Sequence, residues 1–345
     1  MSRSRTMTAA FAWLAMASPV LAQDSDAPEQ TDADRPTETS ADQRPGSRPI
    51  RPIIGDGRPS LEPSYSFSVD STYQYSAPVD DDLGEDLGEV SKFSITANLG
   101  VMIPIDEQSS LSLSFADKTT DYNFTTGGVG LITTGGDPFD IVRTNSIGLR
   151  YARRFNETFQ PYVAGGVTSS RARDASFEQS FTFAGLLGTR IVVNDELDIT
   201  LGGGLASRLE GNFLFVPGFG VNWRPTDRLT IGTNTLPRGG SLGGGGGISY
   251  KLDDSFTLGF NVNFERDEFR IDEGREPIKG GVARDSSLFF TLTSRWTPSP
   301  RWIIDASVSV VTERELQLLD RSGLERSDLR FDNALGVGVG VEYRF

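Results

Sequence analysis

The last twelve residues, 334–345, read ALGVGVGVEYRF, and this stretch decides the fold. Large apolar or aromatic residues occupy alternate positions, and glycine or a charged residue stands between them. Successive side chains of a β-strand point to opposite faces of the sheet, so this spacing predicts a strand with one bulky face and one small or polar face. The bulky face carries Val337, Val339, Val341, Tyr343 and Phe345, and the other face carries Gly338, Gly340, Glu342 and Arg344.

The same period continues backward through the chain to residue 64, for example in LSLSF (111–115) and FTLGFNVNF (256–264). We count about fourteen such segments, and an even number is what an antiparallel closed barrel requires. Tight connections such as PIDEQ and RFNET alternate with longer ones such as RIDEGREPIKGGVARD. The sequence therefore predicts an all-β fold, an antiparallel up-and-down β-barrel of about 14 strands, with about 12 or 16 as alternatives.

One of the expected long loops is ELQLLDRSGLERSD, residues 315–328. It carries apolar residues without a clear two-residue period across its centre, so we expect a loop with a short turn of helix.

The second face of these segments separates a membrane barrel from a soluble β-sandwich. In a soluble sandwich the outer face usually carries long charged side chains, whereas here it is mostly Gly, Ser, Thr, Asn and Ala. Small polar residues suit the interior of a barrel, and a face of Leu, Val and Phe suits lipid. We therefore expect a transmembrane barrel over residues 64–345 with its apolar face outward.

Aromatic residues near the tight turns agree with a position in a membrane. Outside residues 1–22 the chain has three tryptophans, and each lies beside an expected tight turn on the bulky face. Aromatic side chains gather at both interfaces of membrane barrels. The predicted aromatic girdle consists of Trp223, Trp296, Trp302, Tyr151 and Tyr343.

With these features in place, residues 334–345 resemble the terminal strand of bacterial outer-membrane β-barrel proteins. In that family a final aromatic residue, an aromatic two positions earlier and alternating apolar residues form the signal read by the barrel assembly machinery. Tyr343 and Phe345 match these positions. The resemblance implies residence in the bacterial outer membrane, contact with its lipids, insertion by that machinery and membership of a porin-like family. It implies no particular solute.

The N-terminal region has two parts that lie outside the predicted barrel. Residues 1–22 carry Arg3 and Arg5, an apolar run and a small-residue cleavage site ending at Ala22, so we expect a secretory signal peptide. Residues 23–63 are rich in Pro, Asp, Ser and Thr and nearly free of large apolar residues, which predicts a disordered acidic periplasmic segment. A folded plug inside the barrel is the alternative.

Composition excludes several functions. The chain has no cysteine and no histidine, and its net charge is −14, so thiol chemistry, histidine-dependent hydrolysis and nucleic-acid binding are not expected. We expect neither an enzyme nor a cofactor. DDDLGED (80–86) is oxygen-rich but lacks calcium-loop spacing, so we expect no metal site, and GGSLGGGGG (239–247) lacks the lysine of a phosphate-binding loop. The glycine run is expected to be a loop and a thin part of the barrel wall.

What remains is the lumen, where the alternation places charges of both signs. These residues either pair across the wall as structural contacts or form a charged ring that sets ion preference. The candidates are Asp70, Arg150, Arg190, Asp198, Arg208, Lys251, Glu265, Arg295, Asp305, Glu342 and Arg344.

Three functions fit such a barrel. The first is a porin-like channel for small polar solutes. The second is a transporter of hydrophobic molecules, because the long-chain fatty acid transporter family also has fourteen strands, although the Asn-Pro-Ala box and the apolar lumen pocket of that family are not visible in the sequence. The third is a structural or surface-interaction protein that acts through its acidic loops.

Overall fold

The computed structural model describes residues 62–80, 86–126, 139–211, 213–234, 242–274, 278 and 280–345. The expected signal peptide, nearly all of residues 23–63, most of the acidic stretch 80–86 and the first glycines of the run 239–247 lie outside the described residues. The described ranges contain strands, turns and loops and no α-helix. They hold no helix that is long and apolar enough to cross a membrane.

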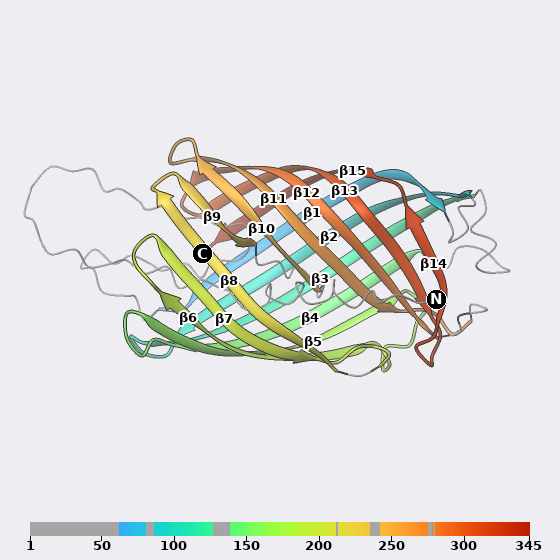
Figure 1. Ribbon diagram of the computed structural model, residues 1–345, viewed down its shortest axis with the longest axis horizontal. Helices are drawn as coiled ribbons and strands as arrows, with labels where there is room; N and C mark the ends of the chain where they lie inside the picture. Colours follow the sequence, from blue (N-terminus) through green and yellow to red (C-terminus); the bar gives the residue numbers. More distant parts are fainter. Residues whose placement is uncertain are drawn as a thin grey trace, which may run out of the picture.

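The fold is a single closed antiparallel β-barrel (Figure 1). Each of the strands β1 to β13 pairs with the next along the chain, and β14 and β15 both pair with β13 and with β1. These last two segments are therefore halves of one wall strand, interrupted at Asp332 and Asn333, so the fifteen segments build fourteen wall strands, as predicted. The segments are β1 (Ser64–Asp80), β2 (Asp86–Pro104), β3 (Ser109–Thr126), β4 (Ile141–Arg153), β5 (Phe159–Ala172), β6 (Phe181–Val192), β7 (Leu197–Ala206), β8 (Leu214–Thr226), β9 (Leu229–Asn234), β10 (Leu242–Lys251), β11 (Phe256–Arg270), β12 (Val282–Ser299), β13 (Trp302–Leu319), β14 (Glu325–Phe331) and β15 (Ala334–Arg344).

The terminal stretch quoted above closes the barrel. β15 pairs with β1 from Ser66↔Arg344 to Gln74↔Gly336, and on its other side it pairs with β13. In Figure 1 the blue first strand accordingly lies beside the red last strand. Closure matters because a sheet edge with unpaired backbone amides is not tolerated in lipid.

Tight turns gather at one end of the barrel, which we call the turn end, and longer connections gather at the other, the loop end. Several tight turns carry Asp or Asn at an equivalent position, and its side-chain oxygen accepts a hydrogen bond from the backbone N–H two residues later. This Asx-turn geometry lets a short connection reverse the chain. The four acceptors are Asp106, Asn156, Asn194 and Asp253, at 2.8–3.0 Å from the donor nitrogens.

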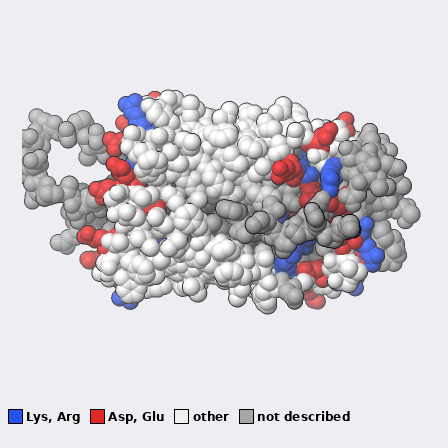
Figure 2. All heavy atoms as spheres, viewed as in Figure 1, with Lys and Arg blue, Asp and Glu red and all other residues white. Residues whose placement is uncertain are grey.

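The two faces of the wall are those predicted. Bulky side chains such as Leu187 and Leu292 project outward and are 69% and 63% exposed, whereas Thr96, Asn222 and Asp198 point inward and are buried. Figure 2 shows the result, an uncharged surface over the middle of the barrel with charged residues at both ends. The outer surface is thus an apolar belt.

One region is more regular than the sequence indicates. The stretch 315–328 is not a loop with a helical turn, because β13 continues to Leu319 and β14 begins at Glu325. The alternation is hidden by a bulge at Glu313, whose φ is 48°, and the register shifts beside it, so that Leu316 and Leu318 face inward. The glycines at 243–247 belong to β10 and form wall, as expected for part of that run.

Candidate functional site: the lumen

The barrel contains a cavity of about 260 Å³ whose lining residues are mostly polar. It lies against the inner face of β1–β3, β8–β13 and β15, and it extends from Lys92 and Lys118 toward Arg295 and Asp305 near the turn end. Between these levels the lining side chains are mostly hydroxyls and amides, which donate and accept hydrogen bonds equally well. They include Ser94, Thr96, Asn222, Thr230, Ser249, Thr257, Asn261, Asn263, Thr291, Thr293, Ser307 and Ser309.

Glycines on the inner face make room for these groups. A Cβ added at Gly340 would meet the carboxylate of Asp70, and one added at Gly247 would meet the side-chain oxygen of Asn261. Any larger residue at either position would push a cavity-lining polar group from its place. The alternate glycines of the terminal strand therefore serve the lumen as well as the wall.

Four of the charged residues expected in the lumen, Asp70, Glu265, Arg295 and Asp305, line this cavity, and most of the candidates are paired with a neighbour. The Arg295 guanidinium donates two parallel hydrogen bonds to Asp305, at 2.8 and 2.9 Å. Such bidentate pairs are among the strongest polar contacts in proteins. Further pairs are Arg190–Asp198 at 2.7 Å, Arg344–Glu342 at 2.8 Å, Lys251–Asp254 at 2.8 Å and Arg208–Glu268 at 3.0 Å.

The remaining three candidates have other surroundings. Asp70 lines the cavity and accepts a hydrogen bond of 3.4 Å from the amide of Asn98. The Arg150 guanidinium lies 4.4 Å from the ring centroid of Tyr162, and Glu265 lines the cavity beside Lys118. The candidates are thus distributed along the wall.

A buried ion network toward the loop end was missed in the sequence. Lys92 Nζ donates to Asp285 at 2.9 Å, the Tyr122 hydroxyl donates to the same carboxylate at 2.8 Å, and Arg314 Nε lies 3.6 Å from its other oxygen. Lys118 Nζ pairs with Asp267 at 2.8 Å. Alternation alone places Lys92 and Lys118 inward in the expected segments 89–103 and 108–120, so the signal was present for both.

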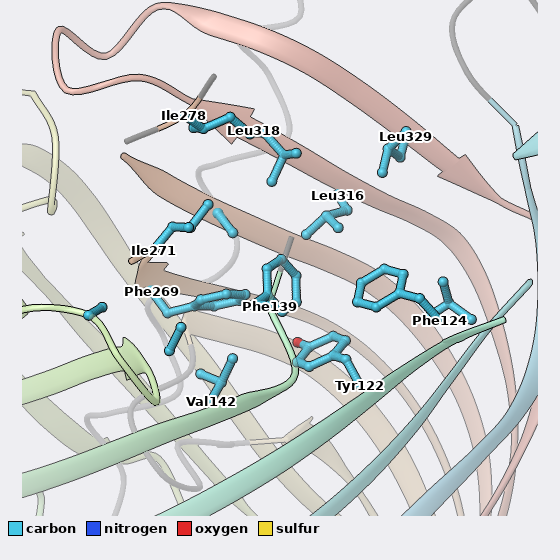
Figure 3. Packing of buried hydrophobic residues seen from close by; sticks show 14 of the residues in the cluster. Tyr122, Phe124, Phe139, Val142, Phe269, Ile271, Ile278, Leu316, Leu318 and Leu329 are labelled. Carbon is cyan, nitrogen blue, oxygen red and sulfur yellow. The ribbon is translucent and has the colours of Figure 1, made fainter. Parts of the chain in front are cut away.

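Beside this network, toward the loop end, buried apolar side chains form a group that we call the loop-end cluster (Figure 3). Its aromatic rings pack edge to face, with centroids 5.0 Å apart for Tyr122–Phe139 and 4.8 Å apart for Phe139–Phe269. An apolar region of the lumen was not visible in the sequence, and the structure has one at this end. The members are Val90, Tyr122, Phe124, Phe139, Val142, Ala172, Ala175, Phe269, Ile271, Ile278, Ala283, Leu316, Leu318, Leu329 and Phe331.

The aromatic residues expected at the turn end project from the outer face there. Trp223, Trp296 and Trp302 are between 44% and 48% exposed, and Tyr151 and Tyr343 are partly buried. The rings of Trp302 and Tyr343 have centroids 4.7 Å apart. Tyr343 in turn lies 4.8 Å from Phe345, so the last strand adds two rings to this row.

The described residues contain no group of three or more Asp, Glu, His or Cys side chains that is arranged to hold a metal ion.

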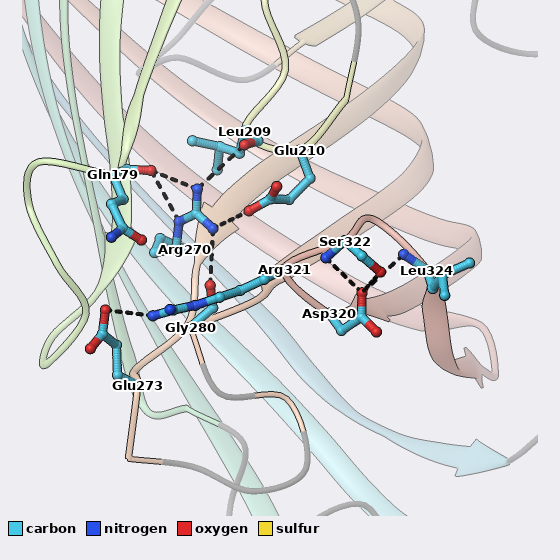
Figure 4. Close-up of polar contacts among 10 residues, drawn as sticks. All are labelled: Gln179, Leu209, Glu210, Arg270, Glu273, Gly280, Asp320, Arg321, Ser322 and Leu324. Carbon is cyan, nitrogen blue, oxygen red and sulfur yellow. Dashed lines mark hydrogen bonds and ion pairs between the residues drawn. The ribbon is translucent and has the colours of Figure 1, made fainter.

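At the loop end, Asp320 organises the turn between β13 and β14 (Figure 4). Its carboxylate accepts hydrogen bonds from the Ser322 hydroxyl at 2.6 Å and from the Leu324 backbone N–H at 3.1 Å, and Arg326 lies against it. The Ser322 hydroxyl is the main reason that the pKa of Asp320 falls to about 2. The ionised carboxylate is thus the form that holds the turn.

We expect the Asp320 turn to loosen only in strong acid. A carboxyl pKa below its value in the unfolded chain stabilises the fold above that value, and the contribution is lost as the pH falls through the folded pKa. The stabilising contribution of Asp320 is therefore lost between pH 3.8, the ordinary pKa of an aspartate, and about pH 2. A carbon-13 titration of the Asp320 carboxyl should show its midpoint near the lower limit, and a midpoint at the ordinary value would contradict the role of these contacts.

Comparison with known proteins yields matches among solved structures. No protein-family profile and no curated protein sequence matches the chain. Among solved structures, an outer membrane channel from Pseudomonas putida F1 has a TM-score of 0.45 and 8% identity, over 85% of this chain and 100% of the other. A mutant of the TodX monoaromatic hydrocarbon channel has a TM-score of 0.43 and 9% identity, over 82% and 90%. The KdgM porin in complex with oligogalacturonate has a TM-score of 0.31 and 11% identity, over 81% and 99%.

Proposed function

We propose that the protein is an outer-membrane channel for small polar solutes and favours uncharged ones. The observation that supports this function best is the polar cavity inside a closed barrel whose outer face is apolar. A hydroxyl- and amide-lined space replaces part of the hydration of a polar solute, and the closed wall isolates that solute from lipid.

The proposed location rests on three features of the chain. The apolar belt suits the hydrocarbon core of a bilayer, and the aromatic row at the turn end suits its interface. The terminal strand with Tyr343 and Phe345 carries the pattern read by the outer-membrane assembly machinery, and residues 1–22 would direct export. The membrane lipids and that machinery are accordingly the proposed partners.

The preference for uncharged solutes follows from the charges that line the cavity. Three cations, Lys92, Lys118 and Arg295, and three carboxylates, Asp70, Glu265 and Asp305, line the cavity. The three cations each pair closely with a carboxylate, and a paired charge attracts a passing ion of opposite sign only weakly. This arrangement favours the structural interpretation of the lumen charges over a charged ring.

Planar-bilayer recording tests the proposal directly. We expect the purified barrel to give conductance steps with a reversal potential near zero in a KCl gradient. Asp305→Asn leaves the Arg295 guanidinium without its carboxylate partner, so the pore should become anion-selective by about threefold or more. Ser307→Ala, which changes a neighbouring lining residue without changing charge, is the matched control. A folded barrel that never conducts would contradict the channel function. An unchanged reversal potential in Asp305→Asn would contradict the explanation of its selectivity.

The loop-end cluster favours a second candidate, the transport of hydrophobic molecules. An apolar ligand could replace the ring contacts within this cluster at little cost in polar desolvation. Mass spectrometry of the barrel purified from membranes distinguishes the two functions, because a hydrophobic compound bound in stoichiometric amount supports transport of such molecules, and its absence favours the polar channel.

A further inference from the structure

The barrel is pinched at its loop end, where two walls that are distant in the sheet meet. β5 and β11 are six strands apart in the sheet order, yet Arg171 at the end of β5 and Arg270 at the end of β11 form a parallel backbone pair. Both strands run from the turn end to the loop end. They can form a parallel pair only if the loop end of one strand leans across the lumen to the other. In an open barrel of this size the strands would stay apart.

Arg270 holds this contact with every nitrogen of its guanidinium (Figure 4). Nε and Nη2 donate to the carbonyl of Gln179 at 3.0 and 2.8 Å, and Nη2 also donates to the carbonyl of Leu209 at 3.3 Å. Nη1 donates to the carbonyl of Gly280 at 2.9 Å and to the carboxylate of Glu210. One side chain, itself 5% exposed, thereby joins the connections that follow β5, β7 and β11.

The loop-end cluster adjoins this contact on its lumen side and contributes an apolar barrier. Phe269, the residue before Arg270, is fully buried in the cluster, and Ala172, the residue after Arg171, belongs to it as well. A polar solute would have to pass through packed rings to leave the polar cavity at this end, and dry apolar constrictions are how many channels block conduction.

We propose that the structure is the closed state of the channel and that Arg270 is the latch of its loop-end mouth. Opening requires the tip of β11 to leave β5, which breaks the Arg270 contacts together and lets the loop-end cluster separate. The role of this latch in gating rests on the proposed channel function. The presence of the latch can be tested without that function.

The test uses the absence of cysteine from the chain. Ala283→Cys places one thiol in the loop-end cluster, where the native side chain is fully buried. In the folded full-length barrel we expect a water-soluble maleimide to modify this thiol about tenfold faster when Arg270→Met is added, because methionine keeps much of the volume and none of the donors. The control is Arg326→Met, which removes an exposed arginine of the same rim that pairs with Asp320 and does not contact the latch.

Single-channel recording of the same variants supplies the second measurement. Arg270→Met should raise the ratio of open to closed time about tenfold, and Arg326→Met should leave it unchanged. Arg270→Lys keeps the charge but cannot reach all the acceptors, so it should give an intermediate labelling rate. It replaces the methionine variant in the test if that variant does not fold. Labelling of folded Arg270→Met or Arg270→Lys at the native rate would overturn the latch. Faster labelling without conductance in any variant would support the latch and contradict the channel.

Discussion

Replacing Asp285 by asparagine should lower the free energy of unfolding by about 3–5 kcal/mol, the usual cost of removing one partner from a buried ion pair. The Asp285 carboxylate is only 2% exposed and lies 2.9 Å from Lys92 Nζ and 3.6 Å from Arg314 Nε. Asparagine preserves the shape and the bond from Tyr122, but it leaves two buried cations without their shared counter-charge. Urea unfolding in lipid vesicles, followed by tryptophan fluorescence, measures the change.

The control for this variant is Asp106→Asn in the tight turn between β2 and β3. Asp106 is exposed and its side-chain oxygen accepts a hydrogen bond from the Gln108 backbone N–H, a role that asparagine also fills. Its unfolding curve should match that of the parent chain. If the Asp285 variant also unfolded like the parent, the buried network would not contribute to the stability of the barrel.

Replacing Leu187 by arginine should cost about 2–4 kcal/mol in a bilayer, because a cation on the lipid face near the midplane has no polar partner. Leu187 is central in β6, projects outward and is 69% exposed. The same vesicle assay measures the loss, which should be accompanied by slower insertion into the membrane.

Val193→Arg is the matched control, since Val193 directly follows the same strand at the turn end and is 53% exposed. An arginine near the interface should cost only about 0–1 kcal/mol. The dependence on depth is the decisive observation. Equal costs at the two positions, or no cost at Leu187, would mean that the exposed leucines and valines do not face acyl chains.

Most of the wall could be predicted because its rule is local. A strand alternates faces whatever its neighbours are, so Val339 faces outward and Asp70 inward for reasons carried by the adjacent residues alone. Tight turns are equally local, since Asp106 and Asn156 form their hydrogen bonds within three residues. The strand count followed from these two patterns together.

The prediction failed where the local rule is interrupted. The bulge at Glu313 shifts the alternation by one position, which moves Leu316 and Leu318 to the inner face and gives residues 315–328 the look of a loop. The apolar end of the lumen was missed for a different reason. Its members come from separate strands and connections, and no single segment carries enough of them to indicate a cluster.

The sequence by itself determined a closed β-barrel with an apolar outside and a polar inside, because a period of two assigns each side chain to a face without reference to the rest of the chain. Only the tertiary structure decided that Arg270 meets the carbonyls of Gln179 and Leu209 and that β11 reaches β5. Those contacts join residues far apart in sequence, and their distances depend on the shape of the whole barrel and the path of several connections.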